Sequence, residues 1–230
     1  MKTLAVDCAT SRFAVAAKNG EDVVKAVFEG SAGGKIKLSS KLLPAMDYVM
    51  KEMGLAPQEL DAAVLTAGPG SFTGLRVGLS ALKALTFAYS TPIYAVPTLD
   101  ALAYPCRTSH QIVLPVIESR RDEFFCAIFM RGQKVSAEED LDVHQILAKL
   151  DSEADVLVCG PAAPQFVELC LSHSPLRHMC YFSPEGDATA SLFAIADQMI
   201  ARGDPPLEDT SGPFYCAQTT YTAAKPHPFA

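Results

Sequence analysis

Tryptophan is absent from the 230 residues, and none of the seven cysteines belongs to a Cys-x-x-Cys pair. An odd number of cysteines, most of them within apolar runs, favours reduced thiols that pack as small hydrophobic side chains over disulfides or a zinc site. The five histidines show neither His-x-x-x-His nor His-Glu-x-x-His spacing. We therefore predict no metal site in this chain.

A basic surface is also missing, since the formal net charge is -7 and the basic residues are scattered. The one tight basic pair, Arg120-Arg121, has acidic residues on both sides. We therefore do not expect strong nucleic-acid binding by this chain alone, and a site shared with a partner stays open. No apolar run approaches the roughly 20 residues that cross a bilayer, and the first one stops at Asp7. We expect a soluble, cytoplasmic protein without membrane contact.

The first half of the chain alternates between strand and helix patterns. Asn19-Gly20 is typical of a two-residue hairpin turn, because both positions tolerate positive φ. Apolar residues at Leu42, Met46 and Val49 have helical spacing. The expected elements are strands at 4–6, 13–17, 23–28, 62–66 and 93–96, and helices at 38–53, from Gly74 to about Tyr89, and after Thr98.

The second half repeats this order. The strand-helix turn LTAGPG at residues 65–70 corresponds to LVCGPA at 157–162. Strands are expected at 113–117, 124–130, from Lys134 and at 155–159, and helices at 144–150, 165–171 and 188–202. A duplicated β-β-β-α-β-α plan predicts a two-lobed α/β protein of the actin-like ATPase (ribonuclease-H-like) fold class. We expect lobes at 1–104 and 105–212, the second one smaller, a tail at 213–230, and a ligand cleft between the lobes.

Gly68 to Gly78, GPGSFTGLRVG, is the densest signal in the chain. A glycine turn that opens a helix can bind phosphate through the helix N-terminal amides. A Walker A loop requires Lys after its last glycine, where this chain has Leu75. A dinucleotide fingerprint requires glycine where Thr73 stands. We favour a tight structural turn capped by Ser71 or Thr73, with phosphate binding as the alternative.

The helix after this turn is apolar almost all round, and only Arg76, Ser80 and Lys83 form a narrow polar stripe. A helix of this kind is buried on more than one side, either in the centre of the core or against a partner. Residue types alone leave both options open.

Candidate chemistry is sparse. No Gly-x-Ser-x-Gly elbow occurs and Cys8 has no nearby histidine, so we predict no catalytic residue. Asp7 and Thr10 follow the first strand and could orient a metal-bound nucleotide phosphate, together with Gly68 and Gly70 of the glycine turn. Acids at strand ends are more often simply solvated.

Five segments together resemble the TsaB (YeaZ) family, over residues 1 to 130 at least. They are LAVDCATSRFAVA, SSKLLPAMDYVM, GPGSFTGLRVGLSALKALTFA, PTLDALA and LPVIESRRDEFFCAIF. The resemblance implies an actin-like fold without activity, an inactive paralogue of TsaD. It also implies a scaffold in the formation of N6-threonylcarbamoyladenosine (t6A) at position 37 of ANN-reading tRNAs. TsaD holds metal through two histidines on its first helix, and residues 37–53 here contain none.

The resemblance further implies TsaD and TsaE as partners, a homodimer in isolation, and tRNA contact only through the complex. It implies no required cofactor, with ATP or ADP and Mg at the shared interface as an option. Family pairing uses the first two helices. The predicted interface residues are Leu42, Met46, Val49, Gly74, Leu75, Gly78, Leu79 and Leu82. Ser39-Ser40-Lys41 departs from the family's His-Ser. Two alternatives are a stand-alone nucleotide-binding ATPase or kinase, and a glycoprotease-like metallopeptidase.

Overall fold

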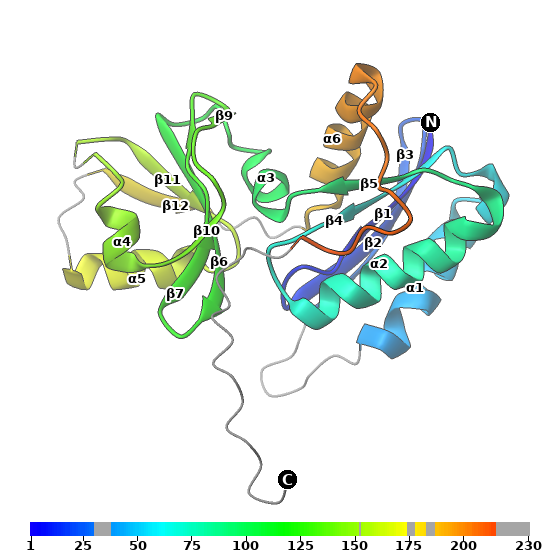
Figure 1. The fold of residues 1–230 in the computed structure, drawn as a ribbon, viewed down its shortest axis with the longest axis horizontal. Coiled ribbons are helices and arrows are strands. Elements are labelled where there is room, and N and C mark those ends of the chain that lie inside the picture. The colour runs from blue at the N-terminus through cyan, green and yellow to red at the C-terminus, as the bar shows by residue number, and fades with distance from the viewer. Residues whose placement is uncertain (30–37, 152, 174–177, 183–186, 215–230) are drawn as a thin grey trace, which may run out of the picture.

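The computed structural model describes residues 1–29, 38–151, 153–173, 178–182 and 187–214. The chain forms two α/β lobes that lie side by side, with a short helix between them (Figure 1). The first lobe contains β1 (Lys2–Asp7), β2 (Arg12–Asn19), β3 (Asp22–Glu29), α1 (Leu38–Glu52), β4 (Ala62–Thr66), α2 (Phe72–Thr86) and β5 (Ile93–Val96). The short helix α3 (Thr98–Ala103) follows.

The second lobe begins with a long strand. It contains β6 (Ile112–Arg120), β7 (Glu123–Cys126), β8 (Phe129–Met130), β9 (Gln133–Lys134), β10 (Glu139–Asp142), α4 (Val143–Leu147), β11 (Val156–Cys159), α5 (Ala163–His173) and β12 (Met179–Phe182). The last helix, α6 (Thr189–Arg202), returns to the first lobe (Figure 1). Among the described residues, no helix is both long and apolar enough to cross a membrane.

The sheet of the first lobe has the strand order β3-β2-β1-β4-β5. The first three strands are antiparallel neighbours, and β4 and β5 run parallel to β1. Because successive side chains of a strand point to opposite faces, Leu4 and Val6 pack with α1 and α2, whereas Ala5 packs with α6. The central strand is therefore buried on both sides, which explains its continuous apolar run.

The second sheet repeats this arrangement with the order β10-β7-β6-β11-β12. The duplicated plan and the two-lobed fold predicted from the sequence are thus confirmed. The strand expected at 124–130 is split into β7 and β8. The break lies at Ile128, whose amide donates to Ser136 Oγ (2.8 Å) and whose carbonyl accepts from the Val135 amide (2.8 Å).

The predicted boundaries between the lobes need correction at two helices. α6 lies within the range 105–212, yet Leu192, Phe193 and Ala196 pack on the first sheet. α3 lies within the range 1–104, yet Leu99 and Ala103 pack with strands of the second sheet. α3 is the last element before the chain enters the second sheet, and α6 is the first element after the chain leaves it. Each helix covers a face of the sheet formed by the other half of the chain. The two lobes therefore share parts of their cores.

Residues 203–214 return along the edge of the first sheet. The Leu207 amide donates to the Ile93 carbonyl (2.6 Å), and the Phe214 amide donates to the Ala67 carbonyl (2.7 Å). Lys83 Nζ donates to the Ser211 carbonyl at 2.8 Å. The first two residues of the predicted tail are thus attached to the first lobe, and residues 215–230 lie outside the described part of the chain.

Candidate functional site

The glycine turn before α2 is packed against the loop between β1 and β2. A Cβ atom on Gly70 would lie 2.2 Å from the Ala9 carbonyl oxygen, and one on Gly74 would lie 2.1 Å from the Cys8 carbonyl oxygen. The Ser71 amide donates to that Ala9 oxygen at 2.7 Å. Glycine at these positions lets two backbone segments touch, which no larger residue allows.

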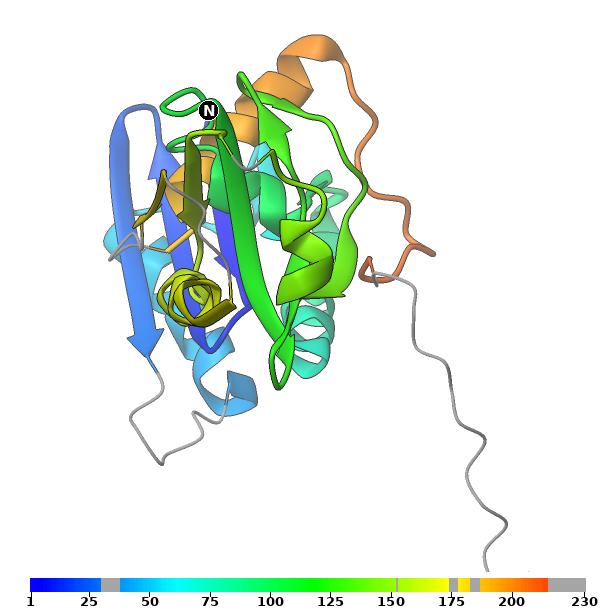
Figure 2. The same cartoon turned by 90° about the vertical axis from the view of Figure 1, so that its left-hand side faces the viewer.

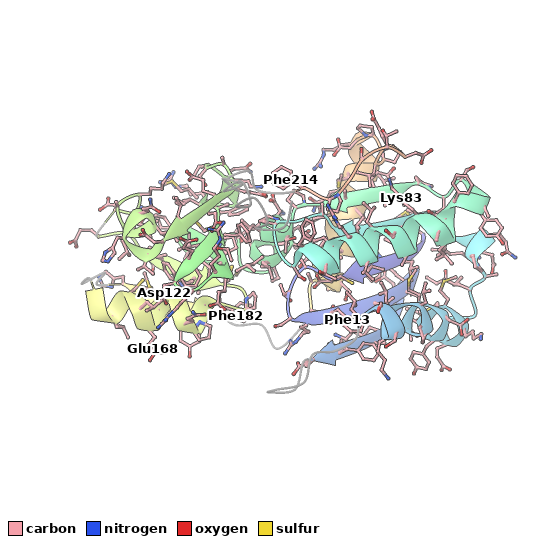
Figure 3. All side chains as sticks on the ribbon, turned by 60° about the horizontal axis from the view of Figure 1, so that its bottom comes forward. Phe13, Lys83, Asp122, Glu168, Phe182 and Phe214 are labelled. Carbon is pink, nitrogen blue, oxygen red and sulfur yellow. The ribbon has the colours of Figure 1, made fainter. Side chains whose placement is uncertain are left out.

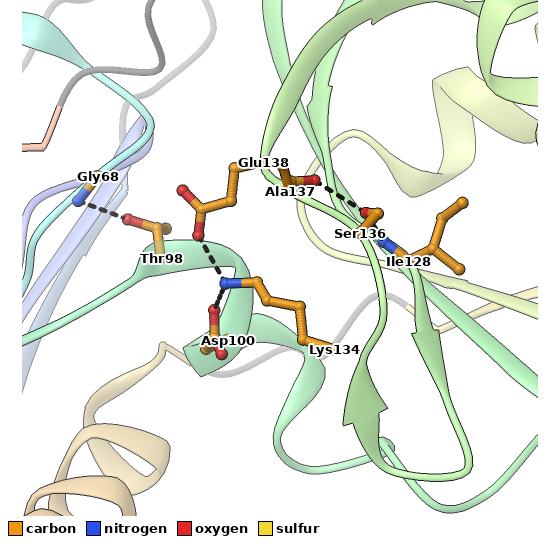
Figure 4. A network of polar contacts seen from close by, with 8 residues as sticks. All are labelled: Gly68, Thr98, Asp100, Ile128, Lys134, Ser136, Ala137 and Glu138. Carbon is orange, nitrogen blue, oxygen red and sulfur yellow. Dashed lines mark hydrogen bonds and ion pairs between the residues drawn. The ribbon is translucent and has the colours of Figure 1, made fainter.

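Three amide groups of the turn, those of Gly68, Ser71 and Gly74, already have partners inside the protein. Gly68 N donates to Thr98 Oγ1 (3.1 Å), a contact that Figure 4 shows. Gly74 N donates to Ser71 Oγ (3.1 Å), so Ser71 is the N-cap of α2. The structural turn capped by Ser71 is confirmed. Phosphate binding through any of these three amides would have to break its existing bond.

Asp7 ends β1 and is buried at the junction of the lobes. Its Oδ1 accepts from the Ala9 amide (3.3 Å) and from Thr66 Oγ1 (3.1 Å), and its Oδ2 accepts from the Ala188 amide (3.2 Å). Burial raises the pKa of Asp7 above its ordinary value, although these donors oppose the rise. The carboxyl group therefore ties β1, β4 and the start of α6 together.

Two small cavities lie in the cleft between the lobes. One of about 200 Å³ is lined by Asp7, Thr10 and the 160–161 turn, and one of about 250 Å³ is lined by Thr10, Ser71 and Glu118. Small-molecule sites usually measure about 300–1,000 Å³, so both are too small for a nucleotide with the lobes placed as they are. Of the four predicted nucleotide contacts, Asp7 and Thr10 line the cleft, and Gly68 and Gly70 do not.

The eight predicted interface residues on α1 and α2 are buried inside the first lobe. Leu42, Met46 and Val49 of α1 and Leu79 and Leu82 of α2 belong to one core cluster with the sheet. Leu75, Gly74 and Gly78 are also buried. The prediction is corrected here, because a side chain that packs on its own sheet cannot also contact a partner. The close approach allowed by Gly78 is to Cys8 and Val6 of the same chain.

The outward sides of the same two helices carry a different apolar set, named here the α1–α2 face. Its large members are at least half exposed: Leu43 (56%), Tyr48 (51%), Phe72 (53%), Phe87 (83%) and Tyr89 (50%). Phe87 and Tyr89 belong to the short turn Phe87–Tyr89 that continues α2. Arg76 covers one ring face, its guanidinium lying 3.9 Å from the Phe72 ring centre.

Sequence reasoning missed this set because it chose the most periodic residues, which are those that face the sheet. The sequence does contain a signal for the exposed set, namely apolar residues that depart from the helical spacing of the buried ones, such as Leu43 beside the buried Leu42. Figure 3 views α1 and α2 side by side, with Lys83 on α2 and Phe214 near its N-terminal end. Lys83 holds the 203–214 segment, so it is not an open member of the polar stripe.

The two sheets with one strand order define the class of this protein: a two-lobed α/β protein of actin-like fold. AlfA from the Bacillus subtilis plasmid pLS32 filament has a similar fold, with a TM-score of 0.50 and 12% identity over 84% of this chain and 98% of that chain. YeaZ from Pseudomonas aeruginosa is more similar, with a TM-score of 0.72 and 24% identity over 93% of this chain and 99% of that chain.

Sequence comparison then narrows the class. The family model "TsaD: tRNA N6-adenosine threonylcarbamoyltransferase" matches residues 35–202, well over half of the chain. TsaB of B. subtilis is 32% identical over 91 residues, 40% of each protein. TsaB of Escherichia coli is 29% identical over 135 residues, 58% of this chain and 57% of that protein. The chain belongs to the TsaB/YeaZ family. The matched regions span about two fifths of the first of these relatives and less than two thirds of the second.

Proposed function

We propose that this protein is a non-catalytic scaffold and activator of a TsaD-containing complex. The complex forms t6A at position 37 of ANN-reading tRNAs, and this chain docks through the α1–α2 face. The observation that carries the proposal is the number of large exposed apolar side chains on the outward sides of α1 and α2, with Phe87 83% exposed. Exposed apolar patches of this kind mark protein–protein interaction sites.

The chemistry of the cleft supports a role without catalysis. Three donors already engage the Asp7 carboxyl group, and the cleft cavities are small. Within the described ranges, no group of three or more His, Cys, Asp or Glu side chains could hold a metal ion. In this proposal the chain requires no cofactor of its own, and ATP or ADP with Mg belongs at the interface with the partner.

The partners in this proposal are those that the family resemblance implies. The chain pairs with TsaD, and TsaE joins the pair. In isolation two copies associate through the same α1–α2 face, and tRNA is contacted only within the complex. Aromatic residues are enriched at such interfaces, which fits Tyr48, Phe72, Phe87 and Tyr89.

Phe87→Glu tests this proposal. A charge at the most exposed of these rings should weaken the heterodimer with the matching TsaD by at least about 2 kcal/mol, or roughly 30-fold in Kd. At protein concentrations where the wild-type chain is monomeric, the thermal unfolding of the isolated variant should not change, because the Phe87 side chain is 83% exposed. Size-exclusion chromatography with light scattering, together with titration calorimetry, measures both effects.

A matched control is Leu171→Glu, which places the same charge on an equally exposed leucine (81%) of α5 in the second lobe. Its TsaD affinity should equal that of the wild-type chain. Wild-type affinity in both Phe87→Glu and Leu43→Glu would contradict docking through the α1–α2 face.

One observation favours a second candidate, a stand-alone nucleotide-binding ATPase or kinase. Asp7 and Thr10 both line the cleft, where an actin-like protein would hold its nucleotide. Titration of the isolated chain with magnesium-ATP, followed by an assay for released phosphate, separates the two proposals. Binding with turnover would replace the scaffold proposal. No described residue favours the glycoprotease-like metallopeptidase.

A further inference from the structure

A groove distinct from the cleft lies where α3, α6 and the β8–β9 hairpin meet. Its volume is about 610 Å³, within the range of small-molecule sites and well above the cleft cavities. Both lobes contribute walls: α6 on one side, the hairpin on the other and α3 between them (Figure 1). The charged and aromatic lining residues are Asp100, Tyr104, Arg107, Arg131, Lys134 and Arg202.

Four cations line this groove in a chain whose net charge is -7. Two of them are neutralised. Lys134 Nζ lies between the carboxylates of Asp100 and Glu138, as Figure 4 shows, and Arg202 pairs with Asp204 at 2.6 Å. Arg107 and Arg131 make no ion pair with any residue in the described ranges. These two guanidinium groups give the groove its positive excess.

The fold brings these two arginines to the same groove. Arg131 and Gly132 form the β8–β9 turn with φ of 50° and 82°. A Cβ atom on Gly132 would lie 3.0 Å from Thr108 Cγ2, so the turn rests against the loop that carries Arg107. Glycine allows this close contact, and Arg131 adopts a left-handed conformation that non-glycine residues rarely take.

Arg107 is also positioned by an aromatic ring. Its guanidinium lies 4.2 Å from the Tyr104 ring centre, and the Tyr104 hydroxyl accepts from Gln198 Nε2 of α6 at 2.8 Å. The hydrogen bond to the Tyr104 hydroxyl fixes the ring, and the ring stabilises the position of the Arg107 guanidinium by a cation–π contact. One arginine is therefore held on the α3 side of the groove, and the other faces it from the hairpin.

We propose that this groove binds the phosphate groups of a nucleotide unit. Guanidinium groups donate two parallel hydrogen bonds to phosphate oxygens, and two unpaired ones in one groove suit a diphosphate. The volume leaves room for the attached sugar and base. The Asp100 carboxylate is engaged by Lys134, which limits its repulsion of the anion. This site does not depend on the scaffold function proposed above.

Calorimetric titration of the full chain with ADP in the absence of Mg²⁺ tests the proposal. We expect saturable one-to-one binding, weakened at least about tenfold by Arg107→Gln and by Arg131→Asn, since each removes a hydrogen bond to a charged group. Asparagine tolerates positive φ, so the second variant keeps the turn. Arg121→Gln, at a side chain 95% exposed on the β6–β7 turn, removes the same charge and should bind as the wild type does.

Two further arms identify the site and the source of the phosphate. Ser11→Glu adds a carboxylate to the cleft and should leave ADP binding unchanged. In the second arm, a single-stranded RNA hexamer replaces ADP in the same titrations. If both arginine variants lose more affinity for the hexamer than for ADP, the phosphate comes from an RNA strand. No saturation by either probe, wild-type affinity in both arginine variants, or loss in Ser11→Glu alone would overturn the proposal.

Discussion

The helices α1 and α2 of the first lobe and α4 and α5 of the second occupy equivalent places in the duplicated plan, yet their surfaces differ. The first pair has 15 residues in each helix, and the second has 5 and 11. Figure 2 turns the second lobe toward the viewer and shows α4 and α5 on its near side. The outward residues of α4 and α5 include His144, Gln145 and Glu168, with Leu171 as their large exposed apolar side chain.

The inner faces of both helix pairs pack on the sheet of their own lobe. Leu42 and Leu82 pack on the first sheet, as Ile146 and Phe166 pack on the second. Among these two pairs of helices, α1 and α2 carry the larger number of exposed apolar side chains, and α5 carries Leu171. The duplicated plan explains why the two cores are alike. The difference between the exposed surfaces of the two helix pairs indicates that the first lobe contacts the partner.

We expect the largest effect on the unfolding free energy when a charge is placed on the inner face of α2, and almost none when the same charge is placed on the outer face of α5. Leu82 is fully buried, so Leu82→Glu places an unpaired charge in the core at a cost of several kcal/mol. Typical domain stability is about 5–15 kcal/mol, so we expect most of it to be lost. Leu171→Glu should change the unfolding free energy by less than about 0.5 kcal/mol. Urea unfolding followed by circular dichroism measures both variants.

Dimers that dissociate in Leu82→Glu while the monomer keeps its wild-type stability would break this comparison. That result would place Leu82 at an interface rather than in the core, as was first predicted from the sequence.

A smaller effect is expected at the glycine turn. Gly74→Ala would bring Cβ to 2.1 Å from the Cys8 carbonyl oxygen, so the backbone must shift at a cost of about 2–3 kcal/mol. Gly212→Ala meets no atom within 4 Å and should be neutral in the same thermal unfolding experiment. Equal melting temperatures for the two variants would mean that the turn does not need the close approach described above.

Local patterns predicted much of the fold. The Ser71 cap and the repeated order of strands depend on neighbouring residues, and the structure contains both. The hairpin between β2 and β3 is also present, but its turn residues are Gly20 and Glu21, one position later than predicted, because Asn19 ends β2 and pairs with Asp22. The exchange of α3 and α6 between lobes depends on contacts between residues far apart in the chain. Strand and helix periodicity contain no information about which sheet a helix covers.

The site was predicted less well for a related reason. α2 is apolar on most sides, so periodicity alone could not show that Leu82 faces the sheet and Phe87 faces outward. Asp7 could be located at a strand end, but its three donors come from the β1–β2 loop, β4 and the start of α6. The cationic groove joins residues of both lobes, and no single stretch of sequence contains them.

The smallest effect concerns the start of α6, where the chain leaves the second lobe. Burial raises the pKa of Asp187, but hydrogen bonds from Thr189 and the Lys25 ammonium outweigh it, so the pKa falls below 3.8. A lowered carboxyl pKa stabilises the fold above the unfolded value, and this stability is lost as the pH falls through the folded value. Asp187→Ala should cost about 1 kcal/mol at pH 7, as for a helix cap.

This cost should shrink as the pH falls below 3.8, which urea unfolding at a series of pH values measures. Glu21→Ala, at an exposed carboxylate in the β2–β3 turn, serves as the control. A cost for Asp187→Ala that is the same at pH 7 and at the lowest pH would contradict the assigned role of the charge.

Hydrogen exchange with and without the matching TsaD tests docking most directly, because it compares the equivalent helices in one experiment. If this chain docks through α1 and α2, TsaD should slow amide exchange in peptides covering residues 38–52 and 72–89 and leave exchange in residues 143–147 and 163–171 unchanged. Protection of the second-lobe helices, with none on α1 and α2, would contradict this docking.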